Sequence, residues 1–404
     1  MITAESLARR LAGLADIGIG PDGVRRLAWT AEDAATRAWF EEQATGIGLR
    51  VERDPAGNLW ACPDVDPPWW GIGSHLDSVR GGGRYDGPLG VACGFEIAGE
   101  VGGRVAVLSF ADEEGARFNT PTFGSKALTG QLDLPAVLDR RDDDGVSLRE
   151  AMGIAGLDPD RLADVRPWQN RLVGFLEIHI DQTTELARAG EPIGMVSALG
   201  ARTRLEVRLT GRADHAGTTP RSERRDALSA AARLIVGAEE LAGADSTLDG
   251  DPDPLTVTAS RIITKPNAPT TITAEARLWI DARARSFTPI DRWRERLDEL
   301  AVELHERLGV EIELAVASRT DAREFDPTLR RGLMRASKEV VGHAAPELVC
   351  FAGHDAGVLA GRLPAAMVFV RNPTGVSHSP EEAIDLEDAA IAARVAALVL
   401  EELA

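Results

Sequence analysis

The sequence has few of the residues on which several enzyme classes depend. Only three cysteines occur among 404 residues, and they lie far apart, at Cys62, Cys93 and Cys350. A small, odd number of separated cysteines argues against a disulfide framework and favours a reducing compartment. The chain also has only three lysines, none in a motif, and no G-x-S-x-G segment. Schiff-base and serine-nucleophile chemistry are therefore disfavoured.

Basic residues are also fewer than acidic ones. The chain has 45 Lys and Arg against 64 Asp and Glu, a net charge of −19 at pH 7. This balance argues against a nucleic acid or an anionic membrane as the partner, because both require a basic surface. The segment MITAESLARRLAGLADIGIG lacks the apolar core of a signal peptide, and no apolar run is long enough to span a bilayer. We therefore expect a cytoplasmic protein.

The length predicts two domains, because 404 residues exceed the size at which a single core stops growing. Outside the middle of the chain, helical segments alternate with short continuous apolar runs. These runs are PWWGIG (68–73), RVAVLSFA (104–111), LVGFLEIHI (172–180) and AAMVFVR (365–371). Such runs are typical of strands that are covered on both faces. We expect an α/β domain with a mainly parallel sheet flanked by helices, formed by residues 1–198 and 318–404.

Residues 199–317 follow a different pattern. The segment TRLEVRLT (203–210) alternates polar and apolar residues with a period of two, which is typical of a half-buried strand. After it come segments that read as a helix, two strands, an amphipathic helix and a last strand. This order is that of the split βαβ arrangement, a small ferredoxin-like α/β sandwich. We expect residues 199–317 to form such a domain, inserted into the first.

Histidines and carboxylates follow several of the predicted buried strands. His75 opens the glycine-rich segment GSHLDSVRGGGRYDG, which also contains Asp86, and His179 ends LVGFLEIHI. Glu113 and Glu114, in DEEGARF, follow RVAVLSFA. Taken singly, an acidic pair after a strand is usually solvated, and a histidine at a strand end is usually structural. The ends of parallel strands meet at one edge of a sheet, however, where ligands collect.

This set of side chains has the composition of a metal site. Histidines together with carboxylates suit zinc or manganese. The carboxylates exceed the needs of one ion, which predicts two ions about 3.5–4 Å apart with one bridging aspartate.

The motifs GSHLDS…YDGPLGV, DEEGARF, EIHIDQ, DHAGTTP, AGHDA and GVSHSP occur in this order along the chain. Together they resemble the allantoate amidohydrolase and N-carbamoyl-L-amino-acid hydrolase family, whose relatives include aminoacylases and di-zinc exopeptidases. The resemblance covers essentially the whole chain. It implies a di-zinc exopeptidase-like catalytic domain and a lid and dimerisation domain at residues 199–317.

The resemblance also implies roles for individual residues. Metal ligands are expected at His75, Asp86, Glu114, His179 and His378. Asp86 bridges the two ions, which are expected to be Mn²⁺ or Zn²⁺, with Co²⁺ or Ni²⁺ as alternatives. Glu113 matches the general base, and Asp77 matches the carboxylate that orients His75. His215 matches a catalytic and substrate-binding histidine that the family brings in from the partner subunit of a homodimer.

Substrate contacts are implied at Gln182, Asn267, Arg283, Gly353 and His354. Asn267 and Arg283 match the family's carboxylate-binding pair, and arginine provides a two-pronged donor for a planar carboxylate. The chain departs from the family in HIDQTTEL, where Asp181 and Thr183 replace the usual Glu and Gly. It also lacks the second asparagine that often follows the first in PNAPTTIT.

The resemblance implies an enzyme that cleaves the ureido C–N bond of a small carboxylate. Allantoate is the first expectation, with ureidoglycine, ammonia and carbon dioxide as products. N-carbamoyl-L-amino-acid hydrolase and β-ureidopropionase are the alternatives, and a dipeptidase is a weaker one. A non-catalytic binding protein of the same fold is disfavoured, because every expected metal ligand and the base are retained.

Overall fold

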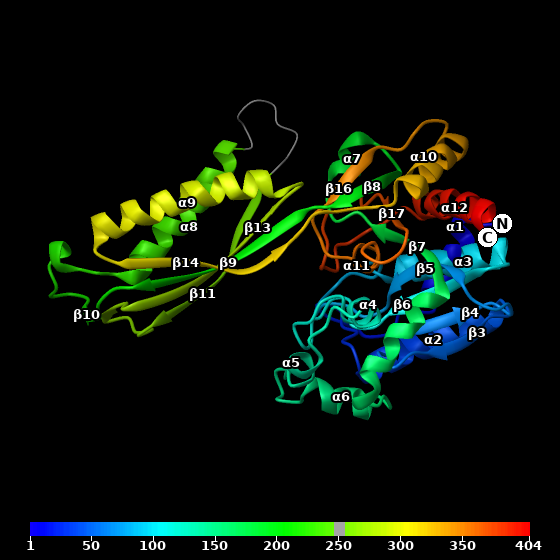
Figure 1. Cartoon of the computed structure of the whole chain (residues 1–404), viewed down its shortest axis with the longest axis horizontal. Helices are drawn as coiled ribbons and strands as arrows, with labels where there is room; N and C mark the ends of the chain where they lie inside the picture. Colours follow the sequence, from blue (N-terminus) through cyan, green and yellow to red (C-terminus); the bar gives the residue numbers. More distant parts are fainter. Residues whose placement is uncertain (246–254) are drawn as a thin grey trace. The chain divides into compact units, whose positions relative to one another are not determined.

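The structure, a computed structural model, describes residues 1–245 and 255–404 (Figure 1). The chain divides into two compact units, one formed by residues 1–197 and 324–404 and the other by residues 198–323. The second junction falls later than the expected 317/318, because the last strand of the inserted unit continues to Thr320. Among the described residues, no helix combines the length and the apolar character needed to cross a membrane.

The first unit is built on a sheet with the strand order β15-β8-β17-β7-β5-β6-β4-β3, with β16 paired to β8. The bounds are β3 Arg50–Arg53, β4 Leu59–Cys62, β5 Trp69–His75, β6 Val105–Phe110, β7 Leu172–Ile180, β8 Ile193–Leu199, β15 Arg323–Glu324, β16 Glu347–Cys350 and β17 Ala365–Val370. The central strands β17, β7, β5 and β6 are parallel to one another. The pairs β17–β8, β4–β6 and β3–β4 are antiparallel. The expected α/β fold with a mostly parallel central sheet is confirmed.

Helices surround this sheet. The helices of the first unit are α1 Ala4–Ala12, α2 Ala31–Gly46, α3 Pro88–Val101, α4 Phe123–Leu128, α5 Leu134–Leu138, α6 Leu148–Ile154, α7 Glu185–Ala189, α10 Pro327–Val341, α11 Asp355–Leu359 and α12 Leu386–Leu403, with a 3₁₀ segment η1 at Pro159–Arg171. A two-stranded ribbon is formed by β1 (Ile19–Gly20) and β2 (Gly23–Val24).

Helix α3 belongs to the centre of the core and starts directly after the glycine-rich segment. Its apolar residues from Pro88 to Phe95 are buried, and it packs against β5, β6, β7 and α12. Gly87 precedes the helix with a φ of 84°, a conformation that glycine adopts without a steric cost, and Pro88 occupies the first turn. The chain therefore turns sharply between Asp86 and a rigid helix, which fixes where Asp86 lies.

The second unit is an antiparallel four-stranded sheet with the order β11-β13-β9-β14. Its elements are β9 Ala201–Thr210, β10 Asp214–His215, η2 Arg221–Glu223, α8 Ala227–Asp245, β11 Thr256–Lys265, β12 Thr271–Ile272, β13 Glu275–Ala284, α9 Phe287–Leu308 and β14 Glu311–Thr320. Strand β9 buries alternate residues, as a half-covered strand must, and these pack with α8 and α9 in a separate core. The main elements occur in the expected order strand–helix–strand–strand–helix–strand.

Candidate active site

The first unit brings the candidate ligands to one edge of its sheet. His75 is the last residue of β5, His179 is the last but one of β7, and Glu113 and Glu114 follow the end of β6. These three strands are parallel, so their ends lie together. Asp86 enters from the loop before α3 and, like both histidines, is almost completely buried.

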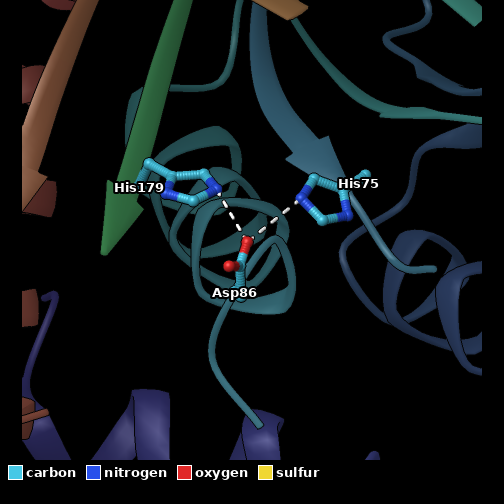
Figure 2. A group of neighbouring side chains, drawn as sticks. All are labelled: His75, Asp86 and His179. Atoms are coloured by element: carbon cyan, nitrogen blue, oxygen red, sulfur yellow. Dashed lines mark ion pairs between the residues drawn. The ribbon is translucent and has the colours of Figure 1, made fainter. Parts of the chain in front are cut away.

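The carboxylate of Asp86 divides its oxygens between two groups of side chains. Oδ1 lies 3.4 Å from Nε2 of His75 and 3.1 Å from Nε2 of His179 (Figure 2). Oδ2 lies 3.5 Å from Nε2 of His378, and this nitrogen lies 3.3 Å from Oε2 of Glu114. Within each group the candidate ligand atoms all lie within 4.8 Å of one another. This is the arrangement expected of a carboxylate that bridges two cations.

Backbone carbonyl groups set the orientation of the two buried imidazoles. Nδ1 of His75 lies 3.0 Å from the carbonyl oxygen of Asp77, and Nδ1 of His179 lies 3.0 Å from that of Ile180. With the proton on Nδ1, each ring donates a hydrogen bond to the backbone and turns a lone pair on Nε2 towards Asp86. A ligating histidine is usually held in this way.

The carboxylate of Asp77 lies near His75 and also bonds to the backbone of the two glutamates. It lies 3.6 Å from Nδ1 of His75, farther than the Asp77 carbonyl oxygen. Its Oδ1 accepts a hydrogen bond from the backbone N–H of Glu113, and its Oδ2 accepts one from that of Glu114, both at 3.1 Å. The backbone of Asp77 therefore orients His75, while its side chain holds the two glutamates in place.

The donor atoms fit a pair of divalent cations. Nε2 of His75, Nε2 of His179 and Oε1 of Glu114 are buried and have no hydrogen-bond partner among the described residues. Buried polar atoms are normally satisfied, so these three are suited to hold a bound cation. Two groups of imidazole nitrogens and carboxylate oxygens that share one aspartate match a dinuclear site for ions such as Zn²⁺ or Mn²⁺.

The charges in this pocket are strongly coupled. Burial opposes ionisation of Asp86, but the adjacent His179 and His75 lower its pKa well below the usual range. Burial also opposes protonation of His75, but Asp86, Glu113 and Asp77 raise its pKa above the usual value. Burial raises the pKa of Glu113 well above the usual range, and nearby carboxylates act in the same direction. Cations in the pocket would compensate this negative charge.

Glu113 and Glu114 occupy different positions, although they are adjacent in sequence. Glu114 lies in the group with Asp86 and His378. Glu113 lies in neither three-residue group, and its Oε2 is 3.8 Å from Nε2 of His75. A carboxylate close to the ligands but outside both groups is suited to proton transfer.

Three other candidates of the first unit lie near these groups. The ring of His354 is 4.3 Å from that of His179, and burial together with the charge of His179 lowers its pKa well below the usual value. Nε2 of Gln182 donates a hydrogen bond to Oδ2 of Asp86 at 3.2 Å. Gly353 is exposed, and apart from its two chain neighbours no described residue has an atom within 4 Å of the position that a Cβ would occupy there.

The structure adds two glutamates that the sequence interpretation missed. Glu177 is fully buried, accepts a hydrogen bond from Ser74 and another from the backbone of Ala356, and groups with His179 and His354. A charged residue inside the apolar run LVGFLEIHI was a signal that could have identified it. Glu382 accepts hydrogen bonds from the backbone at Asp86. Its proximity to Asp86 could not be read from their separation in sequence.

In the second unit, His215 is exposed and has a defined tautomer. It lies on β10, which pairs with β12. Its Nδ1 accepts hydrogen bonds from the backbone N–H groups of Gly217 and Thr218, at 3.0 and 3.1 Å. The neutral ring therefore carries its proton on Nε2, which makes that nitrogen a hydrogen-bond donor.

Asn267 and Arg283 lie at opposite ends of a strand pair. In the pairing of β11 with β13, Arg283 is opposite Thr256, and Lys265 is opposite Glu275. Asn267 follows the Lys265 end and is exposed, whereas Arg283 bonds through Nε to Asp281 at 2.5 Å. At about 3.4 Å per residue, roughly 25–30 Å separates the two. Within one chain they do not form a pair, because the paired strands β11 and β13 run between them.

Comparisons with known proteins show the family of this chain. The model of Peptidase family M20/M25/M40 matches residues 71–402. An N-carbamoyl-L-amino acid amidohydrolase of Geobacillus stearothermophilus is 35% identical, over 98% of this chain and 97% of its own length. An allantoate amidohydrolase of Bacillus subtilis is 30% identical, over 93% of this chain and 92% of its own length.

Solved structures show the same relationship. The crystal structure of an amidase of the hydantoinase/carbamoylase family from Burkholderia multivorans superimposes with a TM-score of 0.85 at 29% identity, over 99% of this chain and 98% of that one. The expected resemblance is confirmed. The chain belongs to the metal-dependent hydrolase family M20/M25/M40 and is an amidohydrolase related to the N-carbamoyl-L-amino-acid and allantoate amidohydrolases.

Proposed function

We propose that this amidohydrolase cleaves the carbamoyl C–N bond of a small ureido carboxylate at a dinuclear metal site. The observation that carries the proposal is the division of the Asp86 oxygens between His75 with His179 and His378 with Glu114. A ureido carbonyl is a poor electrophile, and its hydrolysis needs strong activation of both the water and the carbonyl group. Two divalent cations, when bound, would lower the pKa of a shared water and polarise the carbonyl oxygen.

The side chains of this protein would manage the proton and the developing charge. Glu113 would accept the proton of the attacking water and deliver it to the departing nitrogen, as a general base that becomes a general acid. Asp77 would hold the backbone of Glu113 during both steps through the bond at 3.1 Å. Nε2–H of His215 would donate a hydrogen bond to the oxyanion of the tetrahedral state.

Recognition of the substrate would use groups from both units. Arg283 would bind the carboxylate with its guanidinium, which offers two parallel donors. Gln182 and His354, which lie beside Asp86 and His179, would contact the ureido end of the substrate. Asn267 would supply a further polar contact, and Gly353, which has no side chain, would admit the substrate close to the backbone.

We propose that the protein works as a homodimer with an active site completed across the interface. His215 and Asn267 lie towards one end of the inserted unit, because β10, which carries His215, pairs with the Thr271 segment that follows Asn267. Arg283 lies at the opposite end of the β11–β13 pair. A small substrate cannot span that distance. If both ends contact one substrate, they must come from different chains, and the inserted unit then serves as a lid and a dimerisation domain.

Two substrates remain as specific candidates. Allantoate is favoured by the motif VRNPTGVSHSPEE. N-carbamoyl-L-amino acids are favoured by two relatives named as N-carbamoyl-L-amino-acid amidohydrolases, which are 35% and 33% identical to this chain. Both substrates carry the same reacting group beside a carboxylate, so the same side chains would serve for either.

Ammonia release tests the reaction and separates the candidates. The manganese- and zinc-loaded protein would be supplied with allantoate, a series of N-carbamoyl-L-amino acids and N-carbamoyl-β-alanine. We expect turnover of at least one ureido carboxylate and none of the matched amide that lacks the carboxylate. Efficient cleavage of dipeptides without turnover of any ureido acid would contradict the proposal.

Subunit exchange tests the composite site. Inactive Glu113→Ala and inactive His215→Ala proteins would be mixed in equal amounts under conditions that exchange subunits. About half of the dimers are then mixed, and each contains one site with both defects and one intact site, so activity should return to about a quarter of wild type. If mass analysis shows the mixed dimer but no activity returns, His215 serves the site of its own chain.

A further inference from the structure

Glu382 holds the backbone of the loop that presents Asp86. Its Oε1 accepts one hydrogen bond from the backbone N–H of Tyr85 at 2.7 Å and another from that of Asp86 at 3.0 Å. The residue is only 6% exposed. Burial raises the pKa of Glu382 to about 7, while the two backbone bonds favour its ionised form. Two bonds to successive peptides stabilise this conformation of the loop. The position of the Asp86 carboxylate therefore depends on Glu382.

The glycine-rich loop leaves room for this carboxylate at Gly83. A Cβ at Gly83 would overlap the Glu382 carboxylate and come within 2.6 Å of Oε2. The backbone of Gly83 is outside the left-handed region, so its conformation alone does not demand glycine. A side chain at position 83 would therefore have to displace the Glu382 carboxylate from its present place.

Arg26 supplies a buried positive charge close to the same loop. It is only 1% exposed. Its backbone N–H donates a hydrogen bond to the hydroxyl of Ser78 at 2.8 Å, and its carbonyl oxygen accepts one from the backbone N–H of Ser78 at 3.0 Å. Burial lowers the pKa of Arg26 to about 10, while the charges of Asp77 and Glu382 act in the opposite direction. The negative charges of Asp77 and Glu382 therefore both favour the charged form of the buried Arg26.

The segment that carries Glu382 also reaches the other side of Asp86. Ser377 donates a hydrogen bond from Oγ to Oδ2 of Asp86 at 3.1 Å, and His378 stands 3.5 Å from the same oxygen. Residues 377–382 thus contact both the side chain and the backbone of Asp86. A displacement of this segment would alter both groups of candidate ligands together.

We propose that Glu382 is a positioning residue of the dinuclear site, which fixes the backbone of Asp86 in the space provided by Gly83 so that Asp86 can bridge the two ions. This inference rests on the proposed metal site and adds a residue that touches neither substrate nor metal. Partners of metal ligands commonly contribute to metal affinity in this way.

Metal affinity of the folded protein provides the first test. Glu382→Ala should weaken binding of Mn²⁺ or Zn²⁺, measured by competition with a chromogenic chelator well below the unfolding temperature, by about 10–100-fold. Glu382→Gln should retain more affinity, because its amide oxygen can still accept both backbone N–H bonds. The matched control is Glu381→Ala, since Glu381 is the adjacent carboxylate and is exposed, and it should change affinity by about twofold or less. Wild-type affinity in Glu382→Ala would overturn the proposal.

A double-mutant cycle tests whether a Cβ at position 83 acts by displacing the Glu382 carboxylate. Gly83→Ala alone should weaken metal binding, because its Cβ displaces the Glu382 carboxylate. In the Glu382→Ala background the same substitution should cause little further loss, since the atoms it would strike are gone. Gly153→Ala is the control, because its Cβ would enter open space. Equal losses from Gly83→Ala in both backgrounds would show that Gly83 and Glu382 act independently and would overturn the proposal.

Failure of the proposed reaction is distinguishable from failure of this inference. A wild-type protein that binds two ions but hydrolyses no ureido acid would contradict the proposed function, while the affinities of the variants would still test Glu382. A wild-type protein that binds no divalent ion would overturn both.

Discussion

The replacement Asp77→Asn separates a role in metal binding from a role in folding. The Asp77 carboxylate is buried and accepts the backbone N–H groups of Glu113 and Glu114, each at 3.1 Å. Asparagine has nearly the same shape, but its amide has only one acceptor oxygen. Its NH₂ group would face the second backbone N–H and leave it unsatisfied, at a cost of about 1–3 kcal/mol.

In the metal-free protein, removal of the buried Asp77 charge raises the free energy of unfolding and so opposes this cost. Burial raises the pKa of Asp77 from 3.8 to about 6. A carboxyl group with a raised pKa does not destabilise the fold below about pH 4, where it is protonated in both the folded and the unfolded protein. Above about pH 6 it is ionised in both, and it destabilises the fold by the full amount. A shift of about two pKa units corresponds to a loss of about 3 kcal/mol in the free energy of unfolding at pH 7. This value already contains the favourable effect of the two backbone hydrogen bonds. Asparagine removes this penalty, so the two effects nearly offset each other.

We therefore expect metal-free Asp77→Asn protein at pH 7 to differ from wild type by no more than about 2 kcal/mol in its free energy of unfolding. Its metal affinity should nevertheless fall by about 10–100-fold, because Glu113 and Glu114 are held less well. Denaturant unfolding in the presence of a chelator measures the first quantity, and chelator competition measures the second. A loss of more than about 4 kcal/mol in metal-free stability with unchanged metal affinity would show that Asp77 only supports the fold, and would refute the reasoning.

Chelation should abolish activity and added divalent metal should restore it, and activity that survives complete metal removal would exclude the dinuclear mechanism. Glu113→Gln should lower kcat by several orders of magnitude with metal content near wild type; loss of metal instead would mean that Glu113 and Glu114 have exchanged roles. Arg283→Lys should mainly raise KM for carboxylate substrates, because a point charge replaces a two-pronged donor, and an unchanged KM would remove Arg283 from the site. Glu52 is paired with Arg171 at 2.8 Å, and this bond, together with the pair to Arg50, lowers its pKa from 4.5 to about 2. The pairs stabilise the fold above about pH 4.5, and this contribution is lost as the pH falls towards 2. Because solvent screens this partly exposed group, Glu52→Gln should cost about 1 kcal/mol at pH 7 and progressively less in acid unfolding experiments. A difference between the two proteins that does not change with pH would contradict this.

The strands and the residues at their ends could be predicted from local patterns. Continuous apolar runs such as LVGFLEIHI can be buried only in the middle of a covered sheet, and parallel strands necessarily bring their ends to one edge. The sequence therefore predicted that His75 and His179 lie near each other. The inserted unit was recognisable for a similar reason, because alternation with period two reports a sheet with one covered face. Its second junction was less accurate, because the exposed last residues of β14 carry no apolar signal.

The roles of individual side chains depended on contacts between distant segments. The sequence could not show that the Asp77 carboxylate holds Glu113 and Glu114, because a motif specifies a residue type and not the atom that it bonds. The sequence predicted that Asn267 and Arg283 act as a pair, but it could not show that strand register places them at opposite ends of β11 and β13, so that one chain alone cannot bring them together. Register is set by pairing along the whole strand, so a local motif does not reveal it.

The sequence by itself determined the fold class, the family and which residue types collect at the sheet edge, since each of these follows from local hydrophobic period and motif order. The resemblance already implied that Asp86 bridges two ions, but only the tertiary structure showed which of its oxygens faces each group and that Glu382 reaches its backbone from 296 residues away along the chain. The physical reason is that bridging and positioning depend on distances of about 3 Å between buried polar atoms. Packing of the complete core sets those distances, and no single segment of the sequence contains them.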